Sequence, residues 1–218
     1  MNGMNPQITQ IRRIALLRIA PKGRKMIAQG EALGRERQAT EALKGRHNLT
    51  LCEGETAMES IEVRRVTQND AVFLQQLMNN DQIMAILHEV PRSVDVWADA
   101  IVGWDNDPDE EDYIVLDEGM PIGWLGINGL SSESKQVFMK MMALLPTHQG
   151  RGIGQRVVKE MIENLRLRGF ASLELYTDVG NVRAQHCYRR CGFNISEKTV
   201  QKMSDGTIVD RCRMKLSL

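Results

Sequence analysis

The chain has few cysteines, prolines and aromatic residues, and it has no long apolar run. Its 218 residues include 4 Cys, 6 Pro and 18 Gly, and aromatic residues make up 5%. Without biased repeats, this composition excludes collagen-like, elastic and wholly disordered proteins. No run approaches the ~20 apolar residues that cross a bilayer, because Arg18 interrupts the best candidate. We therefore exclude a membrane span.

The cysteines do not form a disulfide framework. Cys52, Cys187, Cys191 and Cys212 make no C-x-x-C pair and lack the regular spacing of a secreted disulfide scaffold. We therefore expect free thiols in a reducing compartment, with the cytoplasm as the default location. Cys187 and Cys191 lie one helical turn apart beside His186, but adjacent helix positions do not all face one metal. We expect buried thiols and no metal site.

The chain has an ordinary globular composition whose charge is unevenly distributed. It is 42% hydrophobic and 26% charged, which fits one compact domain with or without an appendage. The net charge is zero, yet residues 1–50 carry 10 Lys and Arg against 3 Asp and Glu, whereas residues 51–218 carry 18 against 25. We therefore expect residues 1–57 to be a basic extension, weakly structured or helical, and residues 58–218 to form the folded domain.

The role of the extension stays open. Residues 7–19 have an amphipathic helical pattern that ends at Pro21. The segment fits an arm that contacts nucleic acid or a membrane surface, or an organelle transit sequence. We favour a third interpretation, a dispensable leader or an upstream start, because Met58 stands directly before the first expected strand. We therefore expect neither a membrane nor nucleic acid among the partners.

The remainder predicts an α+β domain with a mixed, mostly antiparallel sheet and flanking helices. One strand, helix, strand succession is typical of a parallel crossover; the strands before it form a meander and those after it a hairpin. Gly123, Gly126 and Gly129 indicate a bulge or close backbone approach. The expected elements are a strand at 61–67, helices at 70–80 and 95–102, strands at 113–116, 121–128 and 136–145, a helix at 154–169, a strand at 171–178, a helix at 182–191, and strands at 193–203 and 208–218.

A glycine-rich turn leads from a strand directly into the most strongly patterned helix. Residues 148–155 read H-Q-G-R-G-I-G-Q. The glycines allow a ligand to approach the backbone, and the uncapped N–H groups at a helix start attract phosphate oxygens. The loop is neither a Walker P-loop nor a dinucleotide fingerprint, which would need glycine in place of Gln155 or Val157. It predicts a site for an anionic ligand; a plain turn with surplus glycine is the alternative.

Two motifs resemble those of a known family. Residues 149–154 resemble the Q/R-x-x-G-x-G/A pyrophosphate loop of the GCN5-related N-acetyltransferases, the GNAT family. Asn181, Ala184 and Tyr188, followed by Gly192-Phe193, resemble that family's second signature, N-x-x-A-x-x-x-Y and then G-F. The expected order of elements is also the family's order. The stretch Pro121 to Asn128, with the helices before it, is similar to the ribosomal-protein N-terminal acetyltransferase branch.

The resemblance implies acetyl-CoA as co-substrate and no metal. Backbone amides of the loop would hold the pyrophosphate, and the end of the strand before it would pair with the pantetheine arm. Tyr188, two helical turns beyond Asn181 on the same face, would protonate the leaving thiolate as general acid. The residues implied to bind the cofactor are Leu144, Leu145, Gln149, Gly150, Arg151, Gly152, Ile153, Gly154, Gln155 and Asn181.

Simpler roles compete with these assignments. Tyr188 could be a core residue, and Asn181 is also a good helix cap. The family's usual glutamate on the strand before the loop is missing, since that strand carries Lys140 and methionines. A general base is therefore not assigned; Asp178 and two other residues near in sequence, Glu133 and His148, are expected to be solvated surface residues.

The resemblance implies attack by a neutral primary amine on acetyl-CoA, with N–H groups near Leu145 stabilising the oxyanion. The acceptor would be a small cationic molecule, such as a polyamine or aminoglycoside, or a protein N-terminus. The acidic stretch Asp105 to Asp112 could attract such a cation, although acidic loops are usually only solvated. The alternative is a non-catalytic acyl-CoA-binding module that acts through a partner or nucleic acid. A homodimer also stays open.

Overall fold

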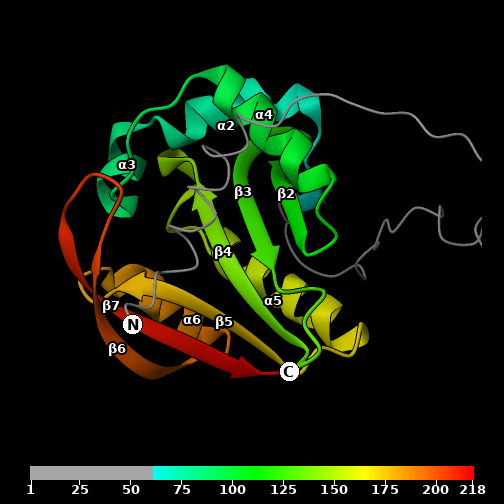
Figure 1. Ribbon diagram of the computed structural model, residues 1–218, viewed down its shortest axis with the longest axis vertical. Helices are drawn as coiled ribbons and strands as arrows, with labels where there is room; N and C mark the ends of the chain where they lie inside the picture. Colours follow the sequence, from blue (N-terminus) through cyan, green and yellow to red (C-terminus); the bar gives the residue numbers. More distant parts are fainter. Residues whose placement is uncertain (1–60) are drawn as a thin grey trace, which may run out of the picture. The chain divides into compact units, whose positions relative to one another are not determined.

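The computed structural model describes residues 61–218, which form one sheet with helices on both faces (Figure 1). Its strands are β1 Ile61–Arg65, β2 Glu110–Asp117, β3 Met120–Asn128, β4 Gln136–Leu144, β5 Ser172–Asp178, β6 Asn194–Lys202 and β7 Ile208–Ser217. Its helices are α2 Ala71–Met78, α3 Asp81–Leu87, α4 Val94–Asp105, α5 Ile153–Leu167 and α6 Val182–Arg190, with 3-10 turns η1 Gln68–Asp70 and η2 Pro146–His148.

The seven strands follow the order β1-β2-β3-β4-β5-β7-β6. Every neighbouring pair is antiparallel except β4 and β5, which are parallel and joined through α5. This arrangement confirms the α+β expectation, with a meander before the crossover and a hairpin after it.

Helix α3 was not expected from the sequence. Asn79 and Asn80 look like the end of a helix, and they do end α2 at Met78. The Asn80 side chain also accepts hydrogen bonds from the N–H groups of Gln82 (3.1 Å) and Ile83 (3.4 Å), so it caps a second helix at once. With seven residues, α3 is too short to show a clear helical period.

Two apolar cores hold the sheet between its helices. On one face, α5 buries Val157, Val158 and Leu165 against the sheet together with Phe193 and Met214. On the other face, α2 and α4 pack over β2 and β3, and this core holds the chain's three tryptophans. Their rings are in direct contact: the Trp124 centroid lies 5.6 Å from that of Trp97 and 5.3 Å from that of Trp104. Burial on both faces keeps the sheet rigid around the loop that follows β4.

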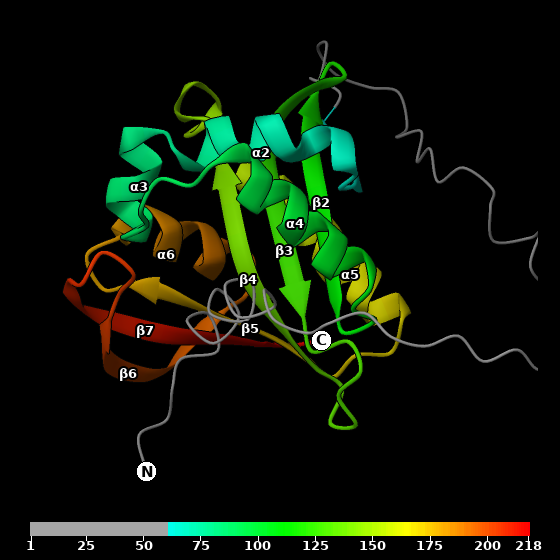
Figure 2. The ribbon, with the colours of Figure 1, turned by 45° about the horizontal axis from the view of Figure 1, so that its top comes forward.

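Strands β4 and β5 pair only at their beginning. The parallel ladder joins Gln136, Val137 and Phe138 to β5 and stops there, whereas β5 pairs with β7 along its whole length (Figure 2). On its other side β4 stays paired with β3 up to Leu144, but the register skips Lys140, which is therefore a β-bulge. A bulge bends its strand and increases its twist. The bend accompanies an opening between β4 and β5, where the edge of β4 from Met139 onward is unpaired within residues 61–218.

The glycines of β3 are required by close approach, as predicted. A Cβ on Gly123 would lie 2.5 Å from the carbonyl oxygen of Ala143, and one on Gly126 would lie 2.6 Å from Asp112 Oδ1. Gly129 has a φ of +85° and would bring a Cβ within 2.6 Å of the Gln136 carbonyl oxygen. Larger residues would therefore push β3 away from its neighbours.

The extension expected at residues 1–57 lies outside the described residues, as does Met58. Among residues 61–218, no helix has the length and apolar character needed to cross a membrane.

Candidate active site

The glycine-rich loop connects the end of β4 to the first turn of α5. Gly150 and Gly152 have φ angles of +80° and +83°, a left-handed conformation that other residues rarely adopt. A Cβ at either position would meet nothing within 4 Å, so the backbone conformation, and not a lack of room, favours glycine there. The first helical bond runs from the N–H of Arg156 to the carbonyl of Gly152 at 3.1 Å.

This start leaves the N–H groups of Ile153, Gly154 and Gln155 ahead of the first helical bond. Gly152 supplies no side-chain cap, and these groups donate to no acceptor within residues 61–218. Together with the positive end of the α5 dipole, they form a site suited to phosphate oxygens. The half-exposed Arg151 side chain lies 4.0 Å from Asp117 beside the same loop.

The unpaired edge of β4 begins next to this loop. The Leu145 N–H donates to the Ile122 carbonyl on β3 at 2.8 Å, so among the N–H groups near Leu145 this one is not available to an oxyanion. Backbone groups of successive strand residues point to opposite sides, so those of Leu144 point toward the opening. The Leu144 carbonyl accepts a hydrogen bond from Gln149 Nε2 at 2.7 Å, and Gln149 Oε1 accepts one from Arg183 of α6. Gln149 thus ties the end of β4 to α6.

Helix α6 carries the second motif. The Asn181 side chain accepts a hydrogen bond from the Ala184 N–H at 3.1 Å, which confirms its role as a helix cap. Tyr188 is half-buried with its ring 5.8 Å from that of Phe193. Burial, followed by the neighbouring Cys187 and Cys191, raises the pKa of Tyr188 above its ordinary value. The raised pKa keeps this hydroxyl protonated at neutral pH, and the hydroxyl makes no hydrogen bond to any residue from 61 to 218.

The three segments meet around Gly154. A Cβ placed on Gly154 would lie 3.7 Å from Leu144 Cδ1, 3.7 Å from Met142 Cε and 3.8 Å from Cys187 Sγ. The first turn of α5, the open end of β4 and one face of α6 are therefore in contact. Cys191 Sγ extends this contact by donating to the Gln155 carbonyl at 3.7 Å. The structure thus brings the two sequence motifs together in one place.

The described cysteines are free, as expected. Cys187, Cys191 and Cys212 form no disulfide, and residues 61–218 contain no cluster of His, Cys, Asp or Glu side chains that could hold a metal. The adjacent thiol of Cys191, followed by burial and Arg183, sets the pKa of Cys187, which is lowered overall.

A buried ionic cluster was missed by the sequence reasoning. Lys140 Nζ lies 2.8 Å from Glu110 Oε2 and 2.8 Å from Asp112 Oδ2, and 4.6 Å from the centre of the Trp104 ring. Trp124 Nε1 donates to Asp112 Oδ1 at 2.8 Å. Burial outweighs the nearby ammonium and raises the pKa of Asp112 to about 6. The Lys140 side chain is therefore committed to the core on the α4 side of the sheet.

These contacts correct the interpretation of the acidic stretch. Glu110 and Asp112 are buried strand residues rather than members of a solvated loop. Asp109 accepts hydrogen bonds from the backbone N–H groups of Gly129 (3.2 Å) and Ser131 (2.8 Å), so it fixes the turn after β3. Only part of the stretch is left to attract a cation.

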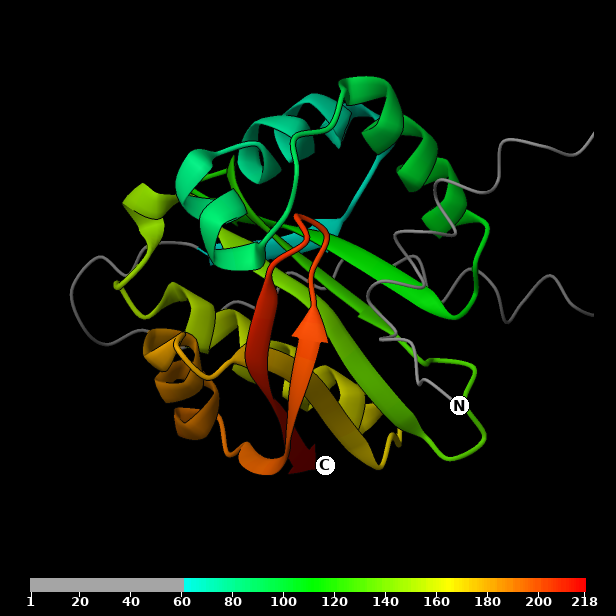
Figure 3. The same ribbon diagram turned by 60° about the vertical axis from the view of Figure 1, so that its left-hand side comes forward.

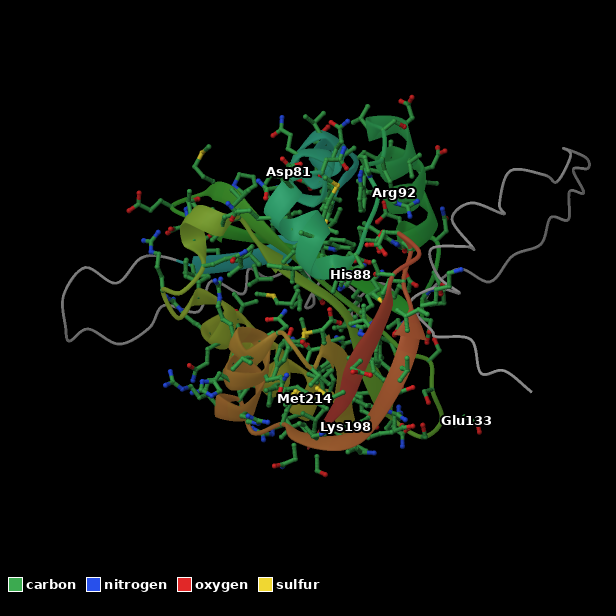
Figure 4. The ribbon with its side chains drawn as sticks, turned by 90° about the vertical axis from the view of Figure 1, so that its left-hand side faces the viewer. Asp81, His88, Arg92, Glu133, Lys198 and Met214 are labelled. Atoms are coloured by element: carbon green, nitrogen blue, oxygen red, sulfur yellow. The ribbon has the colours of Figure 1, made fainter. Side chains whose placement is uncertain are left out.

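Asp178 at the end of β5 is not the solvated surface residue expected from the sequence. Its Oδ2 lies 2.9 Å from His88 Nε2 and its Oδ1 lies 3.0 Å from Arg211 Nε. The carboxyl is only 13% exposed. Glu133, in contrast, is exposed at the edge of the molecule, far from His88 (Figure 4). His88 is 90 residues from Asp178 in the sequence, so no local signal could have found this pair.

The fold and the loop match known proteins. The family model of the acetyltransferase (GNAT) family matches residues 75–193, more than half of the chain. The chain belongs to this family. The description of the family names acetyl transfer as its chemistry. The positive-φ glycines, the uncapped N–H groups and the open strand edge form a site for an extended anionic ligand.

Relatives of the chain are N-acetyltransferases. An uncharacterized N-acetyltransferase of Methanocaldococcus jannaschii is 32% identical over 111 residues, which cover 49% of this chain and 48% of that protein. The chain therefore spans about half the length of this relative. The spermidine N(1)-acetyltransferase of Escherichia coli is 25% identical over 142 residues, which cover 62% of this chain and 74% of that protein.

A solved structure shows the same fold. The spermidine N-acetyltransferase of Vibrio cholerae, in complex with CoA and spermine, superposes with a TM-score of 0.66 at 23% identity. The superposition covers 72% of this chain and 95% of that one. It confirms the expected GNAT fold.

Proposed function

We propose that this protein transfers the acetyl group of acetyl-CoA to a primary amine of a small cationic molecule or a protein N-terminus, by direct attack, with Tyr188 as general acid. The observation that supports this most is the meeting of the glycine-rich loop, the open edge of β4 and α6 around Gly154. One extended thioester can follow these three features in succession.

The co-substrate's position follows from the chemistry of each feature. Its pyrophosphate would accept hydrogen bonds from the N–H groups at the start of α5, with Arg151 adding positive charge. Its pantetheine amides would pair with the backbone of Leu144 along the unpaired edge of β4, as an added strand does. Asn181 would remain the cap of α6, and its side-chain N–H, which donates to no residue from 61 to 218, would face the cofactor.

The chemical step would then need one proton donor. The amine nitrogen forms a bond to the thioester carbonyl carbon, and the collapse of the tetrahedral species breaks the C–S bond. The leaving thiolate takes the Tyr188 hydroxyl proton, which the raised pKa keeps in place at neutral pH. The proton lost by the amine goes to water, because β4 offers Lys140 in an ion pair and no carboxylate.

The acceptor class rests on the relatives. Enzymes named for spermidine are among them, which favours a cationic small molecule. The buried Glu110 and Asp112 weaken the case that the acidic stretch recruits it. A peptide N-terminus is the competing acceptor.

The test is release of CoA thiol from acetyl-CoA with two pools of amines. One pool contains polyamines and aminoglycosides, and the other contains peptides with free N-termini. We expect release with one pool only and its loss in Tyr188→Phe. Tight binding of acetyl-CoA without release from either pool would contradict the proposal and favour a binding module.

A further inference from the structure

His88 occupies an unusual backbone conformation at the end of α3. Its φ and ψ of 55° and 39° are left-handed, which few residues other than glycine adopt. Its carbonyl accepts a hydrogen bond from the Asp205 N–H, in the turn between β6 and β7, at 3.2 Å. In Figure 3 the turn between β6 and β7 lies beside the end of α3. The left-handed turn at His88 directs its carbonyl and imidazole toward segments that are far away in the sequence (Figure 4).

The imidazole of His88 joins two of these segments. Nε2 lies 2.9 Å from Asp178 Oδ2 at the end of β5. Nδ1 lies 3.0 Å from Thr207 Oγ1 and 3.5 Å from Asp205 Oδ2, both in the turn between β6 and β7. Both ring nitrogens of His88 therefore have polar partners within the described residues.

Asp178 contacts the beginning of α6 through its backbone carbonyl. Its backbone carbonyl accepts hydrogen bonds from the Asn181 N–H (3.0 Å) and from Gln185 Nε2 (3.1 Å). Gln185 Nε2 also donates to the Val179 carbonyl at 2.8 Å. A short chain of polar contacts thus connects His88 to the first turn of the helix that carries Tyr188.

We propose that His88 is a positioning residue for acetyl transfer, because its imidazole, together with Arg211, holds the Asp178 carboxylate beside the start of α6. The same side chain holds the turn between β6 and β7 next to that point. This inference rests on the proposed function of Tyr188. A displacement of about 1 Å in a catalytic group lowers turnover by as much as ~100-fold, so loss of the imidazole affects the rate more than the fold.

Substitutions of His88 test separately the contact of Nε2 with Asp178 and the contact of Nδ1 with Thr207. His88→Gly removes the imidazole and suits the left-handed backbone. In His88→Gln the side-chain amide reaches as far as Nε2 and restores the contact with Asp178, whereas His88→Asn reaches only as far as Nδ1. His186→Gln, at an exposed position of α6, is the matched control.

We expect His88→Gly to lower kcat by about 10- to 100-fold with a change of less than about threefold in the KM for acetyl-CoA. His88→Gln should recover most of the lost kcat, and His88→Asn should not. A kcat within about twofold of the wild type in His88→Gly, or equal losses in the Gly and Gln variants, would overturn the inference.

A second measurement does not depend on turnover. Hydrogen exchange at the Ala184 and Gln185 amides should accelerate at least about tenfold in His88→Gly and return toward the wild-type rate in His88→Gln. Unchanged exchange would overturn the role of His88 even if the wild type were active. An inactive wild type with accelerated exchange in His88→Gly would instead count against the proposed function alone.

Discussion

The two sides of strand β4 differ in what their backbone does. Toward β3 the strand is paired as far as Leu144, and the Leu145 N–H continues the pairing. Toward β5 the pairing stops at Phe138, and the freed edge leads to the glycine-rich loop. Lys140 is the β-bulge residue, and its side chain forms ion pairs with Glu110 and Asp112 of β2.

Stability and ligand binding therefore depend on different sides of β4. The paired side is held by buried side chains such as Lys140, so we expect substitutions there to change the free energy of unfolding. The open side uses backbone N–H groups and the half-buried Tyr188, so we expect substitutions there to change affinity and turnover. If stability and binding are separate in this way, a substitution on one side of β4 should leave the property of the other side unchanged.

The largest effect is expected from Lys140→Met. The substitution keeps the apolar stem but leaves Glu110 and Asp112 buried without the ammonium, which should lower the free energy of unfolding by about 3–5 kcal/mol. Urea denaturation measures it. Arg166→Met is the control, because Arg166 pairs with Glu163 on the surface, where a pair contributes about 0–1 kcal/mol. An equal decrease in the free energy of unfolding for the two variants would contradict this prediction. Loss of acetyl-CoA binding in folded Lys140→Met would show that stability and binding do not depend on different sides of β4.

Asp112, on β2, should make the free energy of unfolding depend on pH. Burial raises its folded-state pKa from 3.8 to about 6. The folded chain therefore holds this proton more tightly, so the stabilisation is complete below about pH 4 and is lost as the pH rises through about 6. At ~1.4 kcal/mol per pKa unit the loss is at most about 3 kcal/mol. The measurement is the difference in unfolding free energy between wild type and Asp112→Asn at several pH values; a difference that does not vary with pH would contradict this assignment.

On the open side, Tyr188→Phe should lower kcat by about 100-fold, because general acid catalysis contributes about 10²- to 10⁴-fold. Affinity for acetyl-CoA, measured by calorimetry, should stay within about twofold of the wild type, since the ring is kept. If kcat were unchanged, another group would supply the proton.

The smallest effect is expected from Gly152→Ala. A Cβ at a φ of +83° strains the loop by about 1–2 kcal/mol, which displaces the N–H groups and should weaken acetyl-CoA binding by about 10-fold. Gly119→Ala is the matched control, because Gly119 has a φ of +78° and equally open surroundings in the turn between β2 and β3. A similar loss of affinity in both variants would show that strain alone, and not the loop, is responsible.

Some features of the fold were predictable because their causes are local. The apolar stripe of α5, the capping of α6 by Asn181 and the glycines of the loop each act within one turn of chain. Helix α3 was missed because Asn80 both follows one helix and caps the next, and a single sequence does not distinguish these roles. Asp112 was misplaced because acidic residues are seldom buried without a partner, and Lys140 lies in another strand.

The order of elements apart from α3, the parallel crossover and the loop whose glycines permit positive φ angles all follow from the sequence, because dihedral preference and side-chain period are properties of neighbouring residues. Only the tertiary structure decided which polar groups meet. The opening between β4 and β5 depends on pairing among strands, and His88 contacts Asp178 and Thr207 only because α3, β5 and the turn before β7 fold to one place. Such contacts leave no period or spacing in the chain, since each joins residues that the sequence keeps far apart.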